Sequence, residues 1–175
     1  MSMSLEDSLA EAFDDEFKAR ATYRAVIEAF GEVRPFVHIV ESEERHIEAL
    51  RRLCERHRVA EPPDPWASTV RAPESLAAAC EAAVEAEREN GALYERLIES
   101  AASAGLPDVE ETFRRLMRAS QDNHLPAFER ALARERGGAG ERGGAGGCGP
   151  RGPGGRRRRR HRGGRTADDP AGDRP

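Results

Sequence analysis

The sequence of 175 residues has few cysteines, few aromatic residues and no long hydrophobic run. No segment reaches the roughly 18–20 consecutive apolar residues that span a bilayer, so we expect a cytoplasmic protein with no membrane partner. Cys54, Cys80 and Cys148 are widely spaced and form no Cys-x-x-Cys pair, which argues against a disulfide framework or a tetrathiolate metal site. Cys54 and Cys80 lie on apolar helical stripes, where we expect them to be buried.

Lysine is almost absent, because arginine fills 27 of the 28 basic positions, and charge is unevenly distributed. Residues 1–136 hold 28 acidic and 18 basic residues, a formal charge of −10, whereas residues 137–175 hold 4 acidic and 10 basic residues, a charge of +6. The second segment also holds 14 of the 17 glycines. We therefore predict a folded domain over 1–136 and a disordered Gly/Arg-rich tail over 137–175.

Strand patterns are absent from the folded segment, and its apolar residues recur with helical periodicity. Four helices are expected, at Ser4–Gly31, Pro35–His57, Pro73–Ala104 and Asp108–Arg136. Short connections after the first and third helices require antiparallel hairpins, and the proline-rich segment 59–72 is long enough to cross the end of a bundle. The pattern predicts an all-α four-helix bundle in which one long crossover joins two antiparallel hairpins.

Each predicted helix carries ionisable or polar residues in the middle of its apolar stripe. The elements are Glu16 with Tyr23, Glu43-x-x-His46, Glu87 with Tyr94, and Gln121-x-x-His124. Residues three positions apart share a helix face, so both members of an x-x-His element can reach one centre. Burying such groups without partners costs several kcal/mol each, which indicates that they have partners.

One glutamate from each of two helices and an x-x-His element from each of the others form the ligand pattern of carboxylate-bridged dinuclear metal bundles. The predicted metal ligands are Glu16, Glu43, His46, Glu87 and His124, with the neutral Gln121 as a weak sixth ligand. Carboxylates and imidazoles suit iron or manganese. Tyr23 and Tyr94 lie about 10 Å along the helix from Glu16 and Glu87, so we expect them beside the metal rather than bound to it.

Two other functions compete with the metal site. In the first, the chain is a metal-free helical interaction module whose central charges are hydrogen-bonded, with Glu16 and Arg20 as an i,i+4 ion pair. In the second, the basic run Arg156–Arg160 binds nucleic acid through its phosphates. Metal ions are the first expected partners, and a homodimer is a further candidate.

Pro126 follows His124 by two residues, inside the fourth predicted helix. A proline there removes the hydrogen bond to the carbonyl of Asp122 and kinks a helix. We expect this kink to lie at the site and to widen access to it.

The ordered set of residues resembles the ferritin-like superfamily, specifically an uncharacterised bacterial and archaeal family distantly similar to rubrerythrin. The matching segments are Asp15-Glu16-x-x-Ala19-x-x-x-Tyr23, Ser42-Glu43-x-x-His46, the region of Glu87, and Asn123-His124-Leu125-x-Ala127-Phe128, within residues 5–133. The resemblance implies a ferritin-like bundle with a di-iron centre and a redox, peroxide or iron-handling role, such as a di-iron oxidoreductase or peroxidase-like activity. The rubredoxin domain of rubrerythrin has no counterpart, and Gln121 departs from the full ligand pattern.

Overall fold

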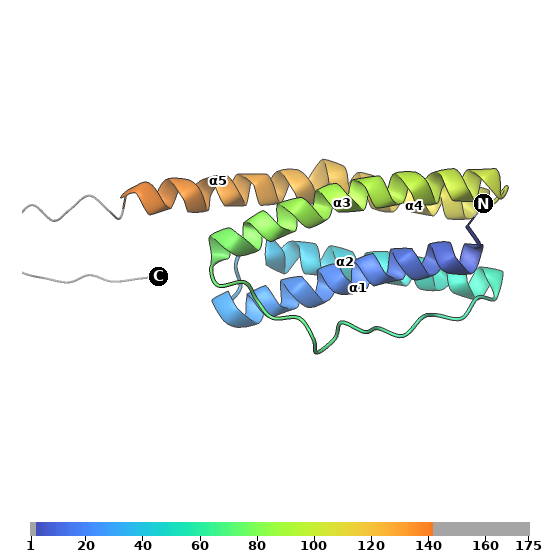
Figure 1. Cartoon of the computed structure of the whole chain (residues 1–175), viewed down its shortest axis with the longest axis horizontal. Helices are drawn as coiled ribbons and strands as arrows, with labels where there is room; N and C mark the ends of the chain where they lie inside the picture. Colours follow the sequence, from blue (N-terminus) through green and yellow to red (C-terminus); the bar gives the residue numbers. More distant parts are fainter. Residues whose placement is uncertain (1–2, 142–175) are drawn as a thin grey trace, which may run out of the picture. The chain divides into compact units, whose positions relative to one another are not determined.

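The computed structural model describes residues 3–141, and side chains through residue 138, as a bundle of long helices (Figure 1). The elements are α1 (Leu5–Phe30), α2 (Phe36–His57), α3 (Leu76–Ser103), α4 (Pro107–Ala119), the π-helical turn η1 (Ser120–His124) and α5 (Leu125–Glu141). No strand occurs in this part of the chain, which confirms the predicted all-α fold. The predicted tail lies outside the described residues apart from its first five positions.

Local sequence signals set the helix ends. Ser4 caps α1, because its side-chain oxygen accepts a hydrogen bond from the backbone N–H of Asp7 at 3.0 Å. Gly31 ends the helix with a φ of 82°, a conformation that favours glycine. Both predicted ends are confirmed. Helix α3 begins at Leu76 rather than at Pro73, because Ser75 provides the same kind of cap to the N–H of Ala78.

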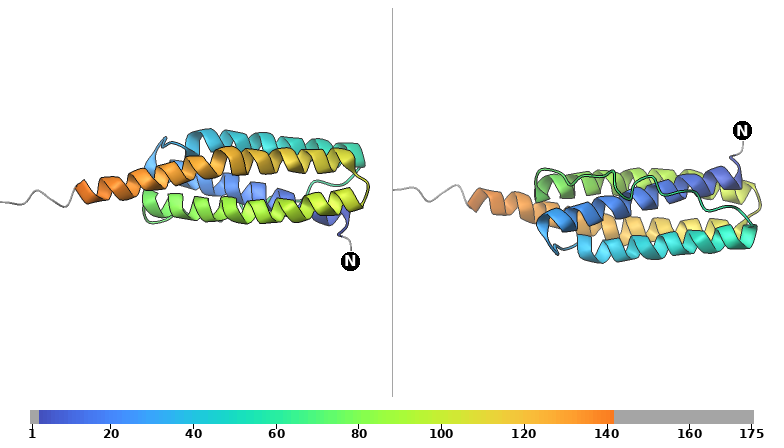
Figure 2. Two further views of the ribbon diagram at one scale, coloured as in Figure 1. Left: turned by 90° about the horizontal axis from the view of Figure 1, so that it is seen from above. Right: turned by 90° about the horizontal axis from the view of Figure 1, so that it is seen from below.

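Helices α1 and α2 form one antiparallel hairpin, and α3 packs antiparallel to the continuous rod made by α4, η1 and α5 (Figures 1 and 2). The segment between α2 and α3 returns along the outside of α1 (Figure 1). Trp66 anchors it by donating from Nε1 to Asp14 Oδ1 at 2.8 Å, and Asp64 pairs with Arg20 at 2.6 Å. The crossover is therefore attached to α1 by side-chain contacts and not only by its two ends.

Apolar side chains fill the bundle in two clusters on either side of a polar layer. One cluster includes Phe13, Phe17, Leu50, Tyr94 and Phe113, and the other includes Tyr23, Val26, Phe36, Ile39 and Phe128. Rings in the second cluster pack with centroids 5.0 to 5.7 Å apart. Cys54 and Cys80 are buried in these clusters, as predicted. The polar layer is thus closed off along the bundle axis by packed apolar groups.

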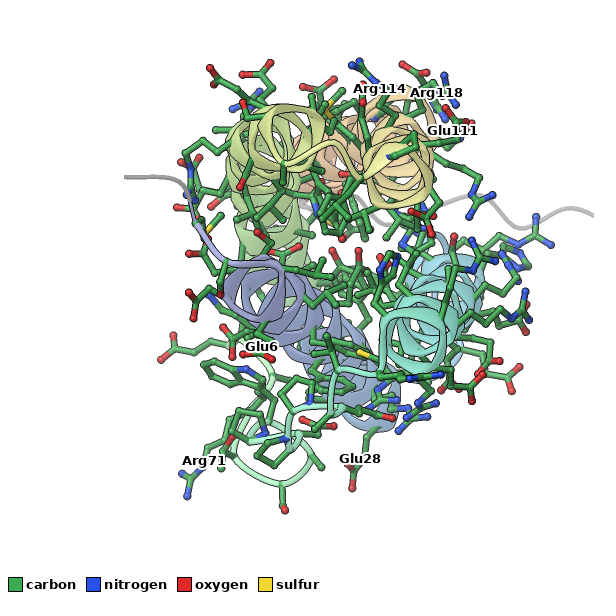
Figure 3. All side chains as sticks on the ribbon, turned by 90° about the vertical axis from the view of Figure 1, so that its right-hand side faces the viewer. Glu6, Glu28, Arg71, Glu111, Arg114 and Arg118 are labelled. Atoms are coloured by element: carbon green, nitrogen blue, oxygen red, sulfur yellow. The ribbon has the colours of Figure 1, made fainter. Side chains whose placement is uncertain are left out.

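The outside of the bundle is charged. The labelled side chains of Figure 3, which are Glu6, Glu28, Arg71, Glu111, Arg114 and Arg118, all project away from the interior. Helix α5 continues to Glu141, five residues beyond the boundary predicted at 136, and extends past the ends of its neighbours (Figure 2). No helix in the described part of the chain is long and apolar enough to cross a membrane.

Candidate metal centre

Five of the six predicted ligands meet in the polar layer between the two apolar clusters. They are Glu16 on α1, Glu43 and His46 on α2, Glu87 on α3, and His124 on η1, and none is more than 6% exposed. The i,i+4 ion pair between Glu16 and Arg20, expected for the metal-free alternative, does not form, because Arg20 pairs with Asp64 on the crossover. Glu16 is therefore buried without an arginine partner, and a buried carboxylate requires other partners.

The five side chains form two groups that share Glu43. In the first group, His46 Nδ1 lies 3.1 Å from Glu16 Oε2 and 2.9 Å from Glu43 Oε2. In the second group, His124 Nδ1 lies 3.2 Å from Glu43 Oε1 and 3.6 Å from Glu87 Oε1. The two oxygens of Glu43 thus face different histidines, and its carboxylate lies between the two groups.

The donor atoms in each group fit a metal ion. An imidazole N–H can donate well to one acceptor, but each Nδ1 here faces two carboxylate oxygens. His124 Nδ1 is buried and has no hydrogen bond of acceptable geometry, although nearly all buried polar atoms have one. The ligand atoms of Glu16, Glu43 and His46 lie within 4.8 Å of one another, as do those of Glu43, Glu87 and His124. Mixed imidazole and carboxylate ligands suit a divalent transition-metal ion.

The charges of the metal-free cluster are mutually dependent. Burial and the charge of Glu43 together raise the pKa of Glu16 to about 8, against the opposing effect of His46. Burial alone would also raise the pKa of Glu43, but the imidazoles of His124 and His46 hold it at about 2. Burial would lower the histidine pKa values, yet the surrounding carboxylates raise that of His46 to about 10 and that of His124 to about 9. Without metal, protons on the histidines offset the buried carboxylate charge.

Two buried tyrosines donate hydrogen bonds to the two unshared glutamates. Tyr94 Oη donates to Glu16 Oε1 at 2.6 Å, and Tyr23 Oη donates to Glu87 Oε1 at 2.9 Å. Each tyrosine therefore contacts the glutamate of the other hairpin, not the one on its own helix. Burial, together with the neighbouring carboxylates, raises both tyrosine pKa values well above the usual value. Both hydroxyls remain protonated donors that fix the orientation of a carboxylate.

The sixth predicted ligand, Gln121, is not part of either group. Its Nε2 donates to the backbone oxygen of Glu87 at 2.6 Å and to Ser120 Oγ at 3.0 Å. The side chain lies against Gly91, where a Cβ would come within 3.0 Å of the Gln121 amide. Gln121 therefore joins η1 to α3 beside the cluster instead of pointing into it.

Ser120 takes the inward position instead. The π-helical turn contains one extra residue, and its hydrogen bond runs from the Leu125 N–H to the Ser120 carbonyl. Ser120, four residues before His124, consequently shares its face, is 2% exposed, and donates from Oγ to Glu87 Oε2. The sequence predicted a kink at Pro126 that widens access to the site. The structure has this π-helical turn in the residues just before the proline, and Pro126 does not line the cavity beside the cluster.

A cavity of about 60 Å³ adjoins the cluster. Its lining includes the five predicted ligands, Tyr23 and Ser120, together with Asp15, Asn90, Ala19, Ala82, Ala83 and Ala86. The exposed residues at its rim, Lys18 on α1 and Ala82 and Glu89 on α3, show that it opens between these two helices. The sequence analysis did not identify Ser120, Asp15 or Asn90 as site residues, although Ser120 lies on the same apolar stripe as His124.

Comparison with known proteins finds a likeness among solved structures. No protein-family model matches the sequence, and no curated protein matches it. The fold is similar to the crystal structure of a hypothetical protein from Methanococcus jannaschii, with a TM-score of 0.67 and 22% sequence identity over 78% of this chain and 83% of that chain. At this level of identity, the likeness establishes a shared helical fold.

Proposed function

We propose that the chain is a ferritin-like protein, distantly similar to rubrerythrin, that holds a dinuclear iron centre in the polar layer of its bundle. The observation that carries this proposal is the position of Glu43, whose two carboxylate oxygens lie 2.9 Å from His46 Nδ1 and 3.2 Å from His124 Nδ1. A carboxylate placed between two imidazoles in this way can bridge two metal ions, as in the dinuclear sites of helix bundles. Manganese, which accepts the same ligands, is the second candidate metal.

The residues divide into two similar ligand sets. His46 with Glu16 would hold one ion, His124 with Glu87 would hold the other, and Glu43 would contact both. Ser120 replaces the second bridging carboxylate of the full pattern, so the protein supplies three carboxylates in total. Two divalent ions with three carboxylates carry a net charge of about +1, so bound ions would offset the buried carboxylate charge that protons on the histidines offset when metal is absent.

The surroundings support a redox, peroxide or iron-handling role. Bound iron would supply one-electron chemistry toward oxygen or peroxide. Tyr23 and Tyr94 orient Glu87 and Glu16, and the apolar clusters exclude bulk water from both ends of the layer. The cavity of about 60 Å³ holds only a few molecules the size of water, which favours a small reactant over a large organic substrate.

Metal analysis of protein purified without chelators tests the proposal. We expect about two iron or manganese ions per chain after anaerobic loading, and a higher thermal unfolding temperature, because an ion that binds only the folded state stabilises it. Fewer than about 0.2 ions per chain, with no stabilisation by Fe(II) or Mn(II), would contradict the proposal and favour a metal-free helical module.

A further inference from the structure

The two hairpins carry several equivalent residues around the cluster, but α1 and α3 differ at two pairs of positions that line the cavity. Glu16 corresponds to Glu87, and the tyrosine seven residues later in each helix corresponds as well. In the same alignment, Asp15 corresponds to Ala86 and Asn90 corresponds to Ala19. All four of these residues line the cavity between α1 and α3. One side of the opening is therefore polar, whereas the equivalent side is formed by alanines.

The polar pair is tightly bonded but incompletely satisfied. Asn90 Nδ2 donates to Asp15 Oδ2 at 2.6 Å, and Asn90 is only 7% exposed. Its carbonyl oxygen Oδ1 is buried with no hydrogen-bond partner. Burial also raises the pKa of Asp15 to about 6, with the Asn90 hydrogen bond acting against this rise. Buried polar groups without partners destabilise a fold.

The fold itself does not require these polar groups. The equivalent positions of the other hairpin hold Ala19 and Ala86, which pack at the same seam without any polar atom in the side chain. The chain thus retains a carboxylate and an unpaired carbonyl oxygen at one side of the opening despite their cost in stability. Such oxygens are the ligands that hard divalent cations accept in place of water.

The charged groups that line the opening beside Asp15 are mostly carboxylates, and Lys18 is the cation among them. Lys18 lies on the same helix, but its ammonium group sits 5.7 Å from the centre of the Trp66 ring on the crossover. Glu89 is exposed at the rim on α3, and Glu87 and Glu43 lie deeper in the layer. Asp15 is thus less deeply buried than Glu87 and Glu43 and lies between the opening and the cluster.

We propose that Asp15 and Asn90 form a transfer site for divalent cations, where an incoming ion exchanges part of its hydration shell for the Asp15 carboxylate and the Asn90 carbonyl oxygen before it reaches Glu16 and Glu87. This inference rests on the proposed metal centre and adds the route by which the centre is filled. The site acts on the rate of loading, and the cluster sets the final amount bound.

The test is the rate at which metal-free protein takes up Co²⁺, followed by the growth of visible ligand-field absorption after rapid mixing. The double variant Asp15→Ala/Asn90→Ala gives this side of the opening the alanines of the other hairpin, so we expect it to fold. Its uptake should be slower by about tenfold, with an unchanged final stoichiometry. Asp15→Asn, which preserves the side-chain shape, should also slow uptake.

Glu89→Gln is the matched control, because it removes one negative charge from the exposed rim of the same cavity. Its uptake rate should stay within about twofold of the unmodified protein, since rim charges act weakly in salt. Equal rates in all variants, or equal slowing by Glu89→Gln, would overturn the transfer site while leaving the metal centre intact. Failure of the unmodified protein to bind Co²⁺, Fe²⁺ or Mn²⁺ would overturn both.

Discussion

At the scale of single residues, the candidate metal centre depends on the orientation of a few buried ionisable side chains. Glu43 faces a histidine with each of its oxygens, and Glu16 and Glu87 are each held by a tyrosine hydroxyl. The heptad spacing of Glu16 and Tyr23 is visible in the sequence, but their contacts are not. Each tyrosine bonds to the glutamate of the other hairpin because bundle packing, rather than spacing along one helix, decides which side chains meet.

Replacing Glu43 by glutamine should reduce metal binding in both groups at once. The amide keeps the shape of the side chain but removes the charge that both ligand sets share, so we expect the amount of Fe(II) bound under anaerobic conditions to fall from about two ions per chain to below about 0.5. Glu41→Gln, an exposed change on the same helix, is the control and should leave binding unchanged. Full binding by Glu43→Gln would contradict a bridging role.

The stability of the metal-free protein should fall as pH rises. The folded-state pKa values of His46 and His124, about 10 and about 9, exceed the ordinary histidine pKa of 6.5, and the pKa of Glu16, about 8, exceeds the ordinary glutamate pKa of 4.5. A group whose pKa is raised in the folded state binds its proton more tightly there than in the unfolded chain. Its contribution to the free energy of unfolding is therefore lost as pH rises through the folded-state pKa. Glu43 has a lowered pKa of about 2, so its stabilising contribution is lost only as pH falls below the ordinary glutamate pKa of 4.5, outside this range.

Chemical unfolding in the presence of a chelator between pH 6.5 and 10 measures this effect. Each proton released on unfolding gives a slope of about 1.4 kcal/mol per pH unit. The slope should decrease in a His46→Gln/His124→Gln variant, which lacks both histidine protons. A free energy of unfolding that is constant or rises over this range would show that the cluster does not hold these protons.

At the scale of secondary-structure elements, η1 decides which residues form the site. The apolar stripe of the fourth predicted helix contains both Ser120 and His124, whereas the x-x-His spacing points to Gln121. In the π-helical turn, Ser120, four residues before His124, shares the face of His124. The hydrophobic periodicity therefore identifies the inward residue correctly, whereas the x-x-His motif points to Gln121, which lies outside the cluster. Helix ends were predictable because caps such as Ser4 are local, but one extra residue in a turn leaves little trace in hydrophobic periodicity.

Gln121→Ala should weaken the fold without emptying the site. The variant loses the hydrogen bond to the Glu87 backbone and the one to Ser120, so we expect a decrease of about 1–2 kcal/mol in the free energy of unfolding and an unchanged number of bound ions. Asp122→Ala, an exposed change in the same turn, should alter stability by less than about 0.5 kcal/mol. Loss of one bound ion in Gln121→Ala would instead identify this side chain as a ligand.

At the scale of the bundle, two apolar clusters close a polar layer that opens between α1 and α3. Composition and periodicity were sufficient to predict the helices and the central position of the charged residues. They could not predict that Arg20 would pair with Asp64, because that contact depends on how the crossover lies against α1. The asymmetry between Asp15 with Asn90 and their alanine counterparts also becomes meaningful only once the cavity is located.

The most direct measurement is anomalous X-ray diffraction at the iron edge from crystals loaded with Fe(II) without oxygen. We expect two anomalous peaks in the polar layer, one beside His46 Nδ1 and the other beside His124 Nδ1, with Glu43 next to both. The absence of any peak there, or metal bound only at the surface of the bundle, would contradict the central claim.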